Sequence, residues 1–426
     1  MLAGRVTSDD PPTMTPRSVT GAVTRPVLRS RLALGFAVPS AFLAMWIVVP
    51  APNRALLPLG VGAPEVSAPL LLAAVVGLLL ALADVRRQMR ARWAALCAVI
   101  AIGLSASPFV RFRSVADDAE QSLRRALGGD YLAHIPAEQR AHFRAAPLVV
   151  ASLFCGLGRP SDSVIVTRQA RIVDASGAQI TYDVYQPTTA GVHPVLVQIY
   201  GGAWQRGQPS DFTEFASDIA AQGYVVFAID YRHAPQYRFP AQLDDVRTAL
   251  RLLNANAARW HADMTRLVLI GRSAGAHLAM LAAYAPDAPP IRGVIDYYGP
   301  VDLVEGYRHP PSPDPLQVRP VEEALMGGTP DAMLERYRVA SPISFVTRHL
   351  PPTLLIYGGR DHIVEPRFGD LLAGRLLAEG NAVVHVEIPW AEHAFDTVPN
   401  GPSGQLARYV TERFLASVTQ PRTTMQ

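Results

Sequence analysis

The segment Gly271–Gly275 reads Gly-Arg-Ser-Ala-Gly and places Ser273 between two glycines. It follows the apolar run Leu267–Ile270 and leads into the alanine-rich stretch Ala274–Tyr284, so it joins a predicted strand to a predicted helix. A serine on such a turn stands clear of the sheet edge, because the glycines let the chain turn sharply. We therefore expect Ser273 to be a nucleophile that attacks an acyl carbon.

A serine hydroxyl needs a base within hydrogen-bond reach, and that base needs an acidic group to hold it. In this strand–turn–helix arrangement the acid and then the histidine follow the serine along the chain. Asp361 and His393 each come just after one of the last two predicted strands, at the sheet edge that carries Ser273. The sequence thus predicts Ser273, Asp361 and His393 as catalytic residues, with His362 as the rival base.

A second glycine turn, Gly201–Ala203, follows another predicted strand. We expect the backbone N–H groups of Gly202, Ala203 and Ala274 to converge on the oxyanion that forms during acyl transfer. No Cys/His cluster has metal-ligand spacing, and no phosphate-binding glycine motif follows a strand. We therefore expect no metal and no cofactor.

The elements that must position these residues alternate from about Ser161 onward. The predicted strands are Val164–Val173, Gln179–Tyr185, Val195–Tyr200, Val225–Asp230, Leu267–Ile270, Ile291–Tyr297, Thr353–Tyr357 and Val383–Ile388. The predicted helices are Phe212–Ala221, Leu243–Asn256, Ala274–Tyr284, Pro366–Leu377 and Gln405–Val418. This order predicts an α/β fold with a doubly wound, mainly parallel eight-stranded sheet that begins antiparallel. A proline-rich interruption predicts a small cap around 300–350.

The N-terminal part of the chain contains three apolar runs without a charged residue: Leu32–Pro50, Val66–Ala83 and Trp93–Val110. Each would be about 27 Å long as a helix, close to the thickness of the hydrocarbon core of a bilayer. We therefore expect three transmembrane helices before the α/β domain.

Arginines are concentrated before the first run and in the loop between the second and third runs, at 86, 87, 90 and 92. The positive-inside rule then predicts a multi-pass membrane protein with a cytoplasmic N-terminus and an extracytoplasmic α/β domain. The predicted regions are a disordered cytoplasmic tail (1–31), a three-span membrane region (32–110), a connector (111–160) and the α/β domain with its cap (161–420). Within the connector, the apolar segment 146–157 is too short to span a bilayer. It could lie on the bilayer surface or on the following domain, and the sequence does not decide between these positions.

The net charge of +3 is not gathered in one patch of the α/β part, and no nucleic-acid motif is present. We therefore expect no nucleic-acid partner. The two cysteines, Cys97 and Cys155, are distant, and Cys97 falls inside an apolar run, so we interpret both as apolar fillers.

Five motifs carry a resemblance to a known family: Tyr200–Trp204, Asp230–Pro235, Phe239–Asp245, Gly271–Ala279 and Ala340–Pro342. They resemble the α/β-hydrolase superfamily, in particular its hormone-sensitive-lipase-like and feruloyl-esterase-like carboxylesterase branch, over about 161–418. The N-terminal block resembles that of membrane-anchored bacterial esterases. The resemblance implies Ser273 as nucleophile, His393 as base and Asp361 as acid, with the three backbone donors named above. Two positions depart from the family pattern: Tyr200, where histidine is usual, and Arg272, where an acidic residue or glutamine is common.

The resemblance implies a membrane-anchored serine carboxylesterase or lipase that hydrolyses acyl esters through an acyl-enzyme. Its expected partners are a small-molecule or lipid ester substrate and membrane lipid. An acyltransferase would use the same three residues, and the sequence does not separate the two. A non-catalytic membrane-anchored binding protein is the alternative from another class, and the complete Ser/Asp/His set argues against it.

Overall fold

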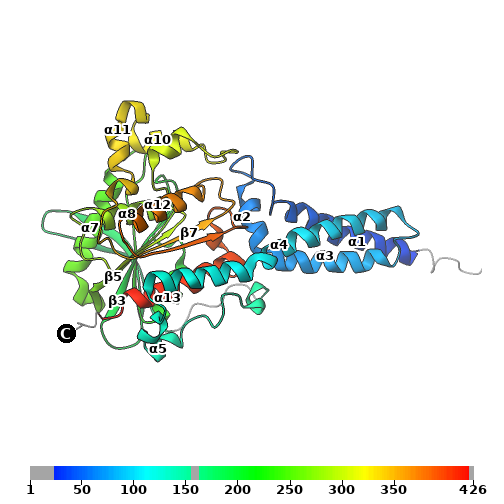
Figure 1. Ribbon diagram of the computed structural model, residues 1–426, viewed down its shortest axis with the longest axis horizontal. Helices are drawn as coiled ribbons and strands as arrows, with labels where there is room; N and C mark the ends of the chain where they lie inside the picture. The colour runs from blue at the N-terminus through cyan, green and yellow to red at the C-terminus, as the bar shows by residue number, and fades with distance from the viewer. Residues whose placement is uncertain (1–23, 155–162, 422–426) are drawn as a thin grey trace, which may run out of the picture.

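The computed structural model describes residues 24–154 and 163–421. A helical bundle projects from one side of an α/β domain, and a small helical cap lies over another side of that domain (Figure 1). The chain passes from the bundle into the α/β domain along one long helix.

The centre of the α/β domain is one eight-stranded sheet with strand order β1-β2-β4-β3-β5-β6-β7-β8. β1 pairs antiparallel with β2, β2 pairs antiparallel with β4, and all other neighbours are parallel. The strands are β1 (Val164–Val173), β2 (Gln179–Pro187), β3 (His193–Ile199), β4 (Val225–Ile229), β5 (Ala262–Arg272), β6 (Gly293–Tyr297), β7 (Thr353–Gly358) and β8 (Val383–Ile388). The prediction of a mainly parallel eight-stranded sheet with an antiparallel start is confirmed.

Helices cover both faces of this sheet: α6 (Thr213–Ala221), α7 (Ala241–Ala255), α8 (Ala274–Tyr284), α12 (Arg367–Ala378) and α13 (Pro402–Val418). α7, α8 and α12 lie on one face, and α6 and α13 lie on the other. β4, β6 and β7 are buried at every position, as expected for parallel strands covered on both sides. The parallel strands therefore end at one edge, where the loops after β3, β5, β7 and β8 come together.

The cap lies between β6 and β7 and contains α9 (Leu303–Arg308), α10 (Val318–Met326) and α11 (Pro330–Val339). In Figure 1, α10 and α11 lie together on one side of the α/β domain, and residues of α9 and α10 line a cavity that contains Ser273. The cap therefore covers the loops that carry the predicted site residues.

The bundle is formed by α1 (Thr24–Met45), α2 (Leu57–Glu65), α3 (Ser67–Leu82) and α4 (Met89–Leu127). Among the described residues, α1 and α4 are long and apolar enough to cross a membrane on their own. α2 and α3 meet this criterion only as a pair, and they are bent by 77° at their junction. Two of the three predicted spanning helices are therefore found as single helices, and the second is found only if the bent pair is counted as one span. α3 alone measures about 24 Å, because the chain bends where α2 turns onto the α/β domain.

The bend fits the contacts that α2 makes. Glu65 is 3% exposed, and its Oε2 accepts a hydrogen bond of 3.0 Å from the backbone N–H of Ser403 at the start of α13. Arg360, after β7, donates to the carbonyl of Val48, which precedes α2. α2 is thus held against the α/β domain and cannot continue the line of α3.

Small residues line the inside of the bundle. Gly77 of α3 lies so close to α1 that an added Cβ would be 3.1 Å from the backbone nitrogen of Ala37. The buried alanines of the bundle include Ala33, Ala37, Ala44, Ala74, Ala81, Ala94, Ala98 and Ala101. Large apolar side chains such as Leu79 and Trp93 point outward, at 63% and 58% exposure. Small residues inside and apolar residues outside are the arrangement of helices packed in lipid.

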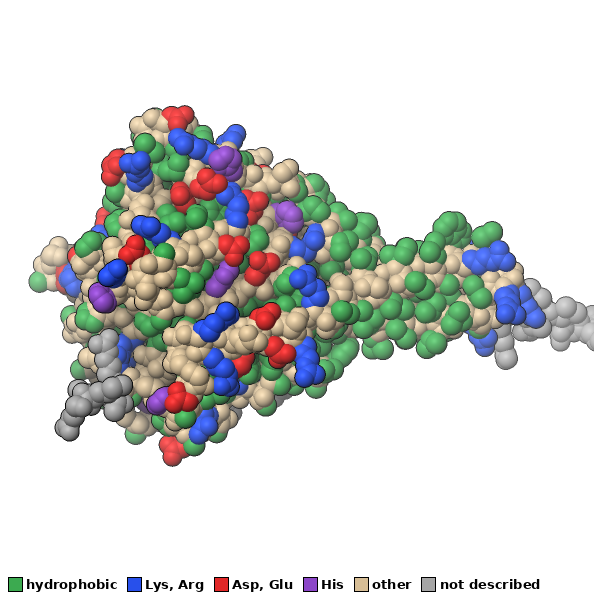
Figure 2. Space-filling view, viewed as in Figure 1, with side chains coloured by type: hydrophobic (Ala, Val, Ile, Leu, Met, Phe, Trp, Pro, Cys, Tyr) green, Lys and Arg blue, Asp and Glu red, His purple; other side chains and the backbone are tan. Residues whose placement is uncertain are grey.

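Figure 2 shows the outside of the bundle as an almost continuous apolar surface, with basic side chains at the end farthest from the α/β domain. That end carries the loop between α3 and α4, which contains Arg86 and Arg87. Charged side chains reappear over the α/β domain (Figure 2). The apolar surface is therefore bounded by charge at both ends.

The predicted connector differs from the observed structure. The sequence places residues 111–127, with their polar helical stretch Ser114–Leu127, in a connector after the third apolar run, whereas α4 continues through them without a break and is 39 residues long. Its second half packs on β8 and α13, because apolar residues recur on one side of it: Phe112, Val115, Ala116, Ala119 and Leu123. These residues belong to the same core cluster as the sheet.

Two other predicted segments, 146–157 and the tail 1–31, can be compared with the structure only in part. In the segment 146–157, Val149 donates its backbone N–H to Gln405 of α13 at 2.7 Å, and Leu148 packs on the core, so this part lies on the α/β domain. Residues 155–157 of that segment and Cys155 lie outside the described residues, as does most of the predicted tail 1–31. The last residues of that tail, from Thr24, begin α1.

Candidate active site

Ser273 lies at the turn from β5 to α8, with φ 52° and ψ −122°. Positive φ is strained for a residue other than glycine, and such strain is concentrated at functional sites. A Cβ on Gly275 would lie 2.2 Å from the carbonyl oxygen of Ile199, and one on Gly271 would lie 2.3 Å from the nitrogen of Ala276. Both glycines are therefore needed because backbone fills the space that a side chain would occupy.

The structure brings the three predicted catalytic residues together. His393 Nε2 lies 3.0 Å from the Oγ of Ser273, and His393 Nδ1 lies 2.7 Å from Oδ2 of Asp361. The other carboxylate oxygen of Asp361 accepts hydrogen bonds of 2.8 Å from the backbone N–H groups of Ile363 and Val364. Burial raises the pKa of Asp361, and the neighbouring His393 opposes this effect. This chain of contacts can take a proton from the serine and hold the imidazole in one orientation.

The rival base, His362, is directed elsewhere. Its Nδ1 lies 2.6 Å from Oε2 of Glu392, and this hydrogen bond raises the pKa of His362. Oε1 of Glu392 accepts from the backbone N–H groups of His362 and His393, at 2.7 and 3.0 Å. Glu392 thus binds the second histidine and fixes the loop that carries His393. Sequence reasoning assigned no role to Glu392.

The three predicted oxyanion donors lie around Ser273. Among the described residues, no acceptor is bonded to the backbone N–H of Gly202, Ala203 or Ala274. Gly202 and Ala203 have φ of 121° and 56°, and a Cβ on Gly202 would lie 2.2 Å from the carbonyl oxygen of Arg206. Three unpaired N–H groups beside a serine can stabilise a developing oxyanion.

Tyr200, the first departure from the family pattern, connects the glycine turn to the end of β4. Its hydroxyl donates to Asp230 at 2.5 Å and lies 2.9 Å from Nε2 of His233, and its ring stacks on Tyr231 at 4.4 Å. Gly207 packs on the same ring, where an added Cβ would lie 2.3 Å from a ring carbon. Tyr200 therefore orders the glycine turn through its own hydrogen bonds.

Arg272, the second departure, is 1% exposed. Its Nε donates to Oδ2 of Asp396 at 2.5 Å, and its guanidinium lies 4.0 Å from the ring centre of Phe212. Asp396 also accepts from the hydroxyl of Tyr298, whose ring lies 4.6 Å from the His393 ring. The charge of Arg272 is therefore paired inside the protein. Through Asp396 this ion pair holds Tyr298, whose ring packs against His393.

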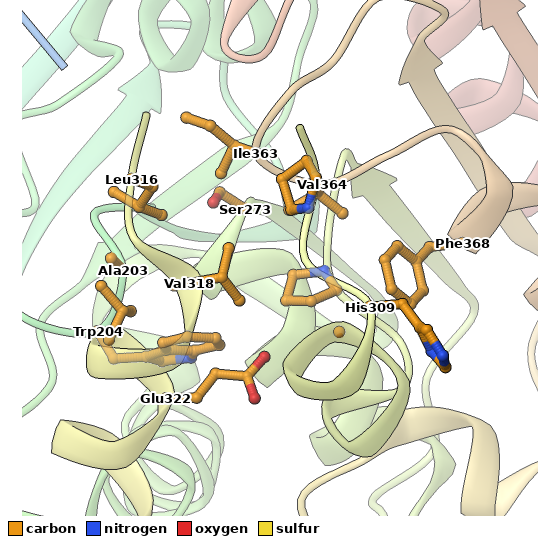
Figure 3. A pocket seen from close by; sticks show the side chains of 15 residues that line it. Ala203, Trp204, Ser273, His309, Leu316, Val318, Glu322, Ile363, Val364 and Phe368 are labelled. Atoms are coloured by element: carbon orange, nitrogen blue, oxygen red, sulfur yellow. The ribbon is translucent and has the colours of Figure 1, made fainter. Parts of the chain in front are cut away.

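Two cavities meet at Ser273. The first lies under the cap, and its walls are mainly apolar (Figure 3); they include Trp204, Leu316, Val318, Val321, Val364 and Phe368, with Glu322 and His309 as its ionisable side chains. The second lies between the glycine turn and His393, and Leu57 of α2 forms part of its wall. Two spaces on either side of a nucleophile can hold the two halves of an ester.

Comparison with known proteins agrees with this geometry. The family model BD-FAE matches residues 182–376, somewhat less than half of the chain. Esterase LipC of Mycobacterium tuberculosis is 34% identical over 240 residues, which cover 54% of this chain and 59% of that relative. This chain therefore spans little more than half the length of that relative.

Two solved structures share the fold. Bacterial Heroin Esterase has a TM-score of 0.54 at 23% identity, with 67% of this chain and 98% of that chain covered. An inhibited Esterase B from Lactobacillus rhamnosis has a TM-score of 0.53 at 21% identity, with 63% and 91% covered. The fold is that of the α/β-hydrolases. It places a serine turn, an acid loop and a histidine loop at the same sheet edge.

Proposed function

We propose that this protein is a membrane-anchored serine carboxylesterase or lipase that hydrolyses acyl esters through an acyl-enzyme. The observation that carries the proposal is the hydrogen-bonded series from Ser273 through His393 to Asp361. The unpaired N–H groups of Gly202 and Ala203 and the esterases among the relatives support it.

In the proposed reaction, neutral His393 accepts the Ser273 proton at Nε2 while Oγ attacks the ester carbonyl carbon. The tetrahedral oxyanion accepts hydrogen bonds from the N–H groups of Gly202, Ala203 and Ala274. His393 then gives the proton to the departing alcohol, which leaves Ser273 acylated. Water, deprotonated by His393, attacks the acyl carbon and releases the acid, and the proton returns to Ser273. Asp361 stabilises the imidazolium in both steps.

The proposed anchor is the helical bundle, in which α1 and α4 cross the bilayer and α3 provides the return crossing, while α2 packs on the α/β domain. The arginine-bearing end of the bundle then faces the cytoplasm, and the α/β domain lies outside it. Leu57 of α2 lines the cavity beside His393, so the site opens next to the part of the chain that approaches the bilayer. This position favours lipid or other membrane-partitioned esters as substrates, alongside small-molecule esters.

The test is the substitution Ser273→Ala in the full chain purified in detergent, with p-nitrophenyl butyrate as substrate. Activity should fall by about three orders of magnitude or more while the melting temperature is retained, because the residues of such a unit act together. Ser344→Ala, at an exposed position of the cap region, is the matched control. A fluorophosphonate probe should label Ser273 and no other serine. A folded Ser273→Ala protein that keeps more than about a tenth of wild-type activity would refute the assignment.

A further inference from the structure

Glu322 lies on α10, at the opposite end of the cap cavity from Ser273. It is 3% exposed and forms part of the cavity wall. In Figure 3, Glu322 and the Trp204 indole lie at one end of the cavity, and Ser273 and Ile363 lie at the other. A group bound in this cavity and attached to Ser273 would therefore extend toward the carboxyl group of Glu322.

Within the part of the chain that the structure describes, the Glu322 carboxyl group has no hydrogen-bond or ion-pair partner, and its Oε2 is fully buried. The other side chains that line the cavity are mainly apolar, among them Val318, Val321 and Phe368, and His309 is its other ionisable side chain. Leaving a buried polar group unpaired costs about 1–3 kcal/mol. Burial, with a smaller contribution from Asp302, raises the pKa of Glu322 well above its ordinary range. Burial thus favours the neutral form of Glu322, which offers a hydrogen-bond donor and an acceptor to the cavity.

Neighbouring acids of the cap do have partners. Glu323 accepts a hydrogen bond of 2.6 Å from the Tyr307 hydroxyl, and Glu305 forms an ion pair of 2.6 Å with Arg367. The space beside Glu322 also depends on a glycine, since a Cβ on Gly306 would lie 3.1 Å from its Oε1. The cap thus holds an unpaired carboxyl group at the end of an apolar cavity.

We propose that Glu322 is a specificity-determining residue that hydrogen-bonds a hydroxyl group at the far end of the substrate part bound under the cap. The inference rests on the proposed function, because it takes the cavity as one half of an ester site. A hydroxyl fits a neutral carboxyl because each has one donor and one acceptor. An ammonium group would need the charged form of Glu322 in an apolar space, with the desolvation of two ions.

The preferred substrate is therefore an ester whose acyl chain or alcohol ends in a hydroxyl, at one chain length set by the cavity. A site built to bind a hydroxyl group discriminates strongly against the analogue that lacks it, because the buried partner is left unpaired. A single hydrogen bond with that penalty gives a preference in kcat/KM of at least about tenfold.

The experiment compares matched esters with the full-length enzyme. One series contains methyl esters of ω-hydroxyalkanoic acids and of n-alkanoic acids of equal length. The second contains acetates of diols and of simple alcohols, and the third contains ω-ammonium analogues of the first two. Acid release is followed in a pH-stat for the wild type, Glu322→Leu and Glu322→Gln. Glu335→Gln, at an exposed position on α11, is the matched control.

We expect the wild type and Glu335→Gln to prefer the hydroxyl-bearing ester at one chain length in one of the first two series. Glu322→Leu should lower that preference at least about tenfold, whereas Glu322→Gln should keep most of it, because an amide also donates and accepts. Equal kcat/KM for hydroxylated and plain esters in the wild type would overturn the inference and leave the proposed function standing. This wild-type comparison decides the matter even where Glu322→Leu does not fold.

Preference for the ammonium series, abolished in Glu322→Gln, would overturn the hydroxyl assignment in favour of a cation. The absence of hydrolysis of every ester, together with the absence of Ser273 labelling, would overturn the proposed function itself.

Discussion

Asp361 and Glu392 are two buried carboxylates on neighbouring loops, and each contacts the Nδ1 atom of one histidine. Only the histidine bonded to Asp361 reaches the Oγ of Ser273. Changing each carboxylate to its amide is therefore a matched experiment. We expect Asp361→Asn to lose nearly all activity and Glu392→Gln to lose much less.

The magnitude follows from the hydrogen bonds at Asp361. One of its oxygens accepts two backbone N–H groups, those of Ile363 and Val364, both at 2.8 Å. The asparagine oxygen must stay at that position, because turning the amide would leave two buried donors unpaired at about 1–3 kcal/mol each. Its NH₂ then faces Nδ1 of His393 and forces the ring proton onto Nε2, where it blocks acceptance of the serine proton. The expected loss in kcat is about 10⁴-fold, or about 5.5 kcal/mol.

The assay is p-nitrophenyl butyrate hydrolysis by both variants of the full chain in detergent, with thermal unfolding measured in parallel. Glu392→Gln keeps an oxygen for its two backbone donors, so we expect a loss below about tenfold in kcat. Both proteins should unfold cooperatively. The reasoning is refuted where Asp361→Asn keeps more than about a tenth of the activity, or where Glu392→Gln loses as much as Asp361→Asn.

Three further outcomes follow from buried groups near the site. Asp396→Ala leaves the charge of Arg272 buried without its partner, so the free energy of unfolding in urea should fall by about 3–5 kcal/mol. The control Asp331→Ala, at an exposed position, should change it by less than about 0.5 kcal/mol. Equal effects of the two substitutions would contradict the buried ion pair. Gly275→Ala should give no active folded protein, because its Cβ would lie 2.2 Å from the Ile199 carbonyl, whereas Gly374→Ala, in α12 with open space around it, should raise the stability by about 0.5–1 kcal/mol. Glu392 raises the pKa of His362 in the folded protein. The stabilisation from this His362–Glu392 pair is therefore complete below the unfolded histidine pKa of about 6.5 and is lost as the pH rises through the raised folded-state pKa. The difference in melting temperature between wild type and Glu392→Gln should shrink from pH 5 to pH 9, and a constant difference would contradict this linkage.

The sheet and the placement of the site residues could be predicted because the signals are local. The runs that precede Ser273, Asp361 and His393 are short, apolar and followed by turn residues, and the structure has a strand at each of them. Parallel strands end at the same edge, so positions just after three strand ends come together without any knowledge of packing.

The features that could not be predicted depend on long-range contacts. Glu322 and Glu323 are adjacent acids on one helix, and the sequence does not reveal which of them faces a cavity. Only the packing of the cap separates them. The bend between α2 and α3 likewise depends on the contact of Glu65 with α13, more than 300 residues away along the chain. The continuation of α4 past the third apolar run could be predicted from the sequence, because its apolar residues recur at helical spacing through Leu123.

The continuous α4 has a consequence for how the proposed enzyme would meet its substrate. A helix of 39 residues is about 58 Å long, and about 30 Å of that suffices for the hydrocarbon core. The remainder is packed into the α/β core, so α4 joins the helical bundle to the α/β domain without a flexible tether. With the bundle in a bilayer as proposed, the opening of the site keeps a fixed distance from the lipid surface and a fixed orientation relative to it. Encounter then becomes a two-dimensional search, in which turnover depends on the density of ester in the membrane plane and changes little with its concentration in the surrounding water.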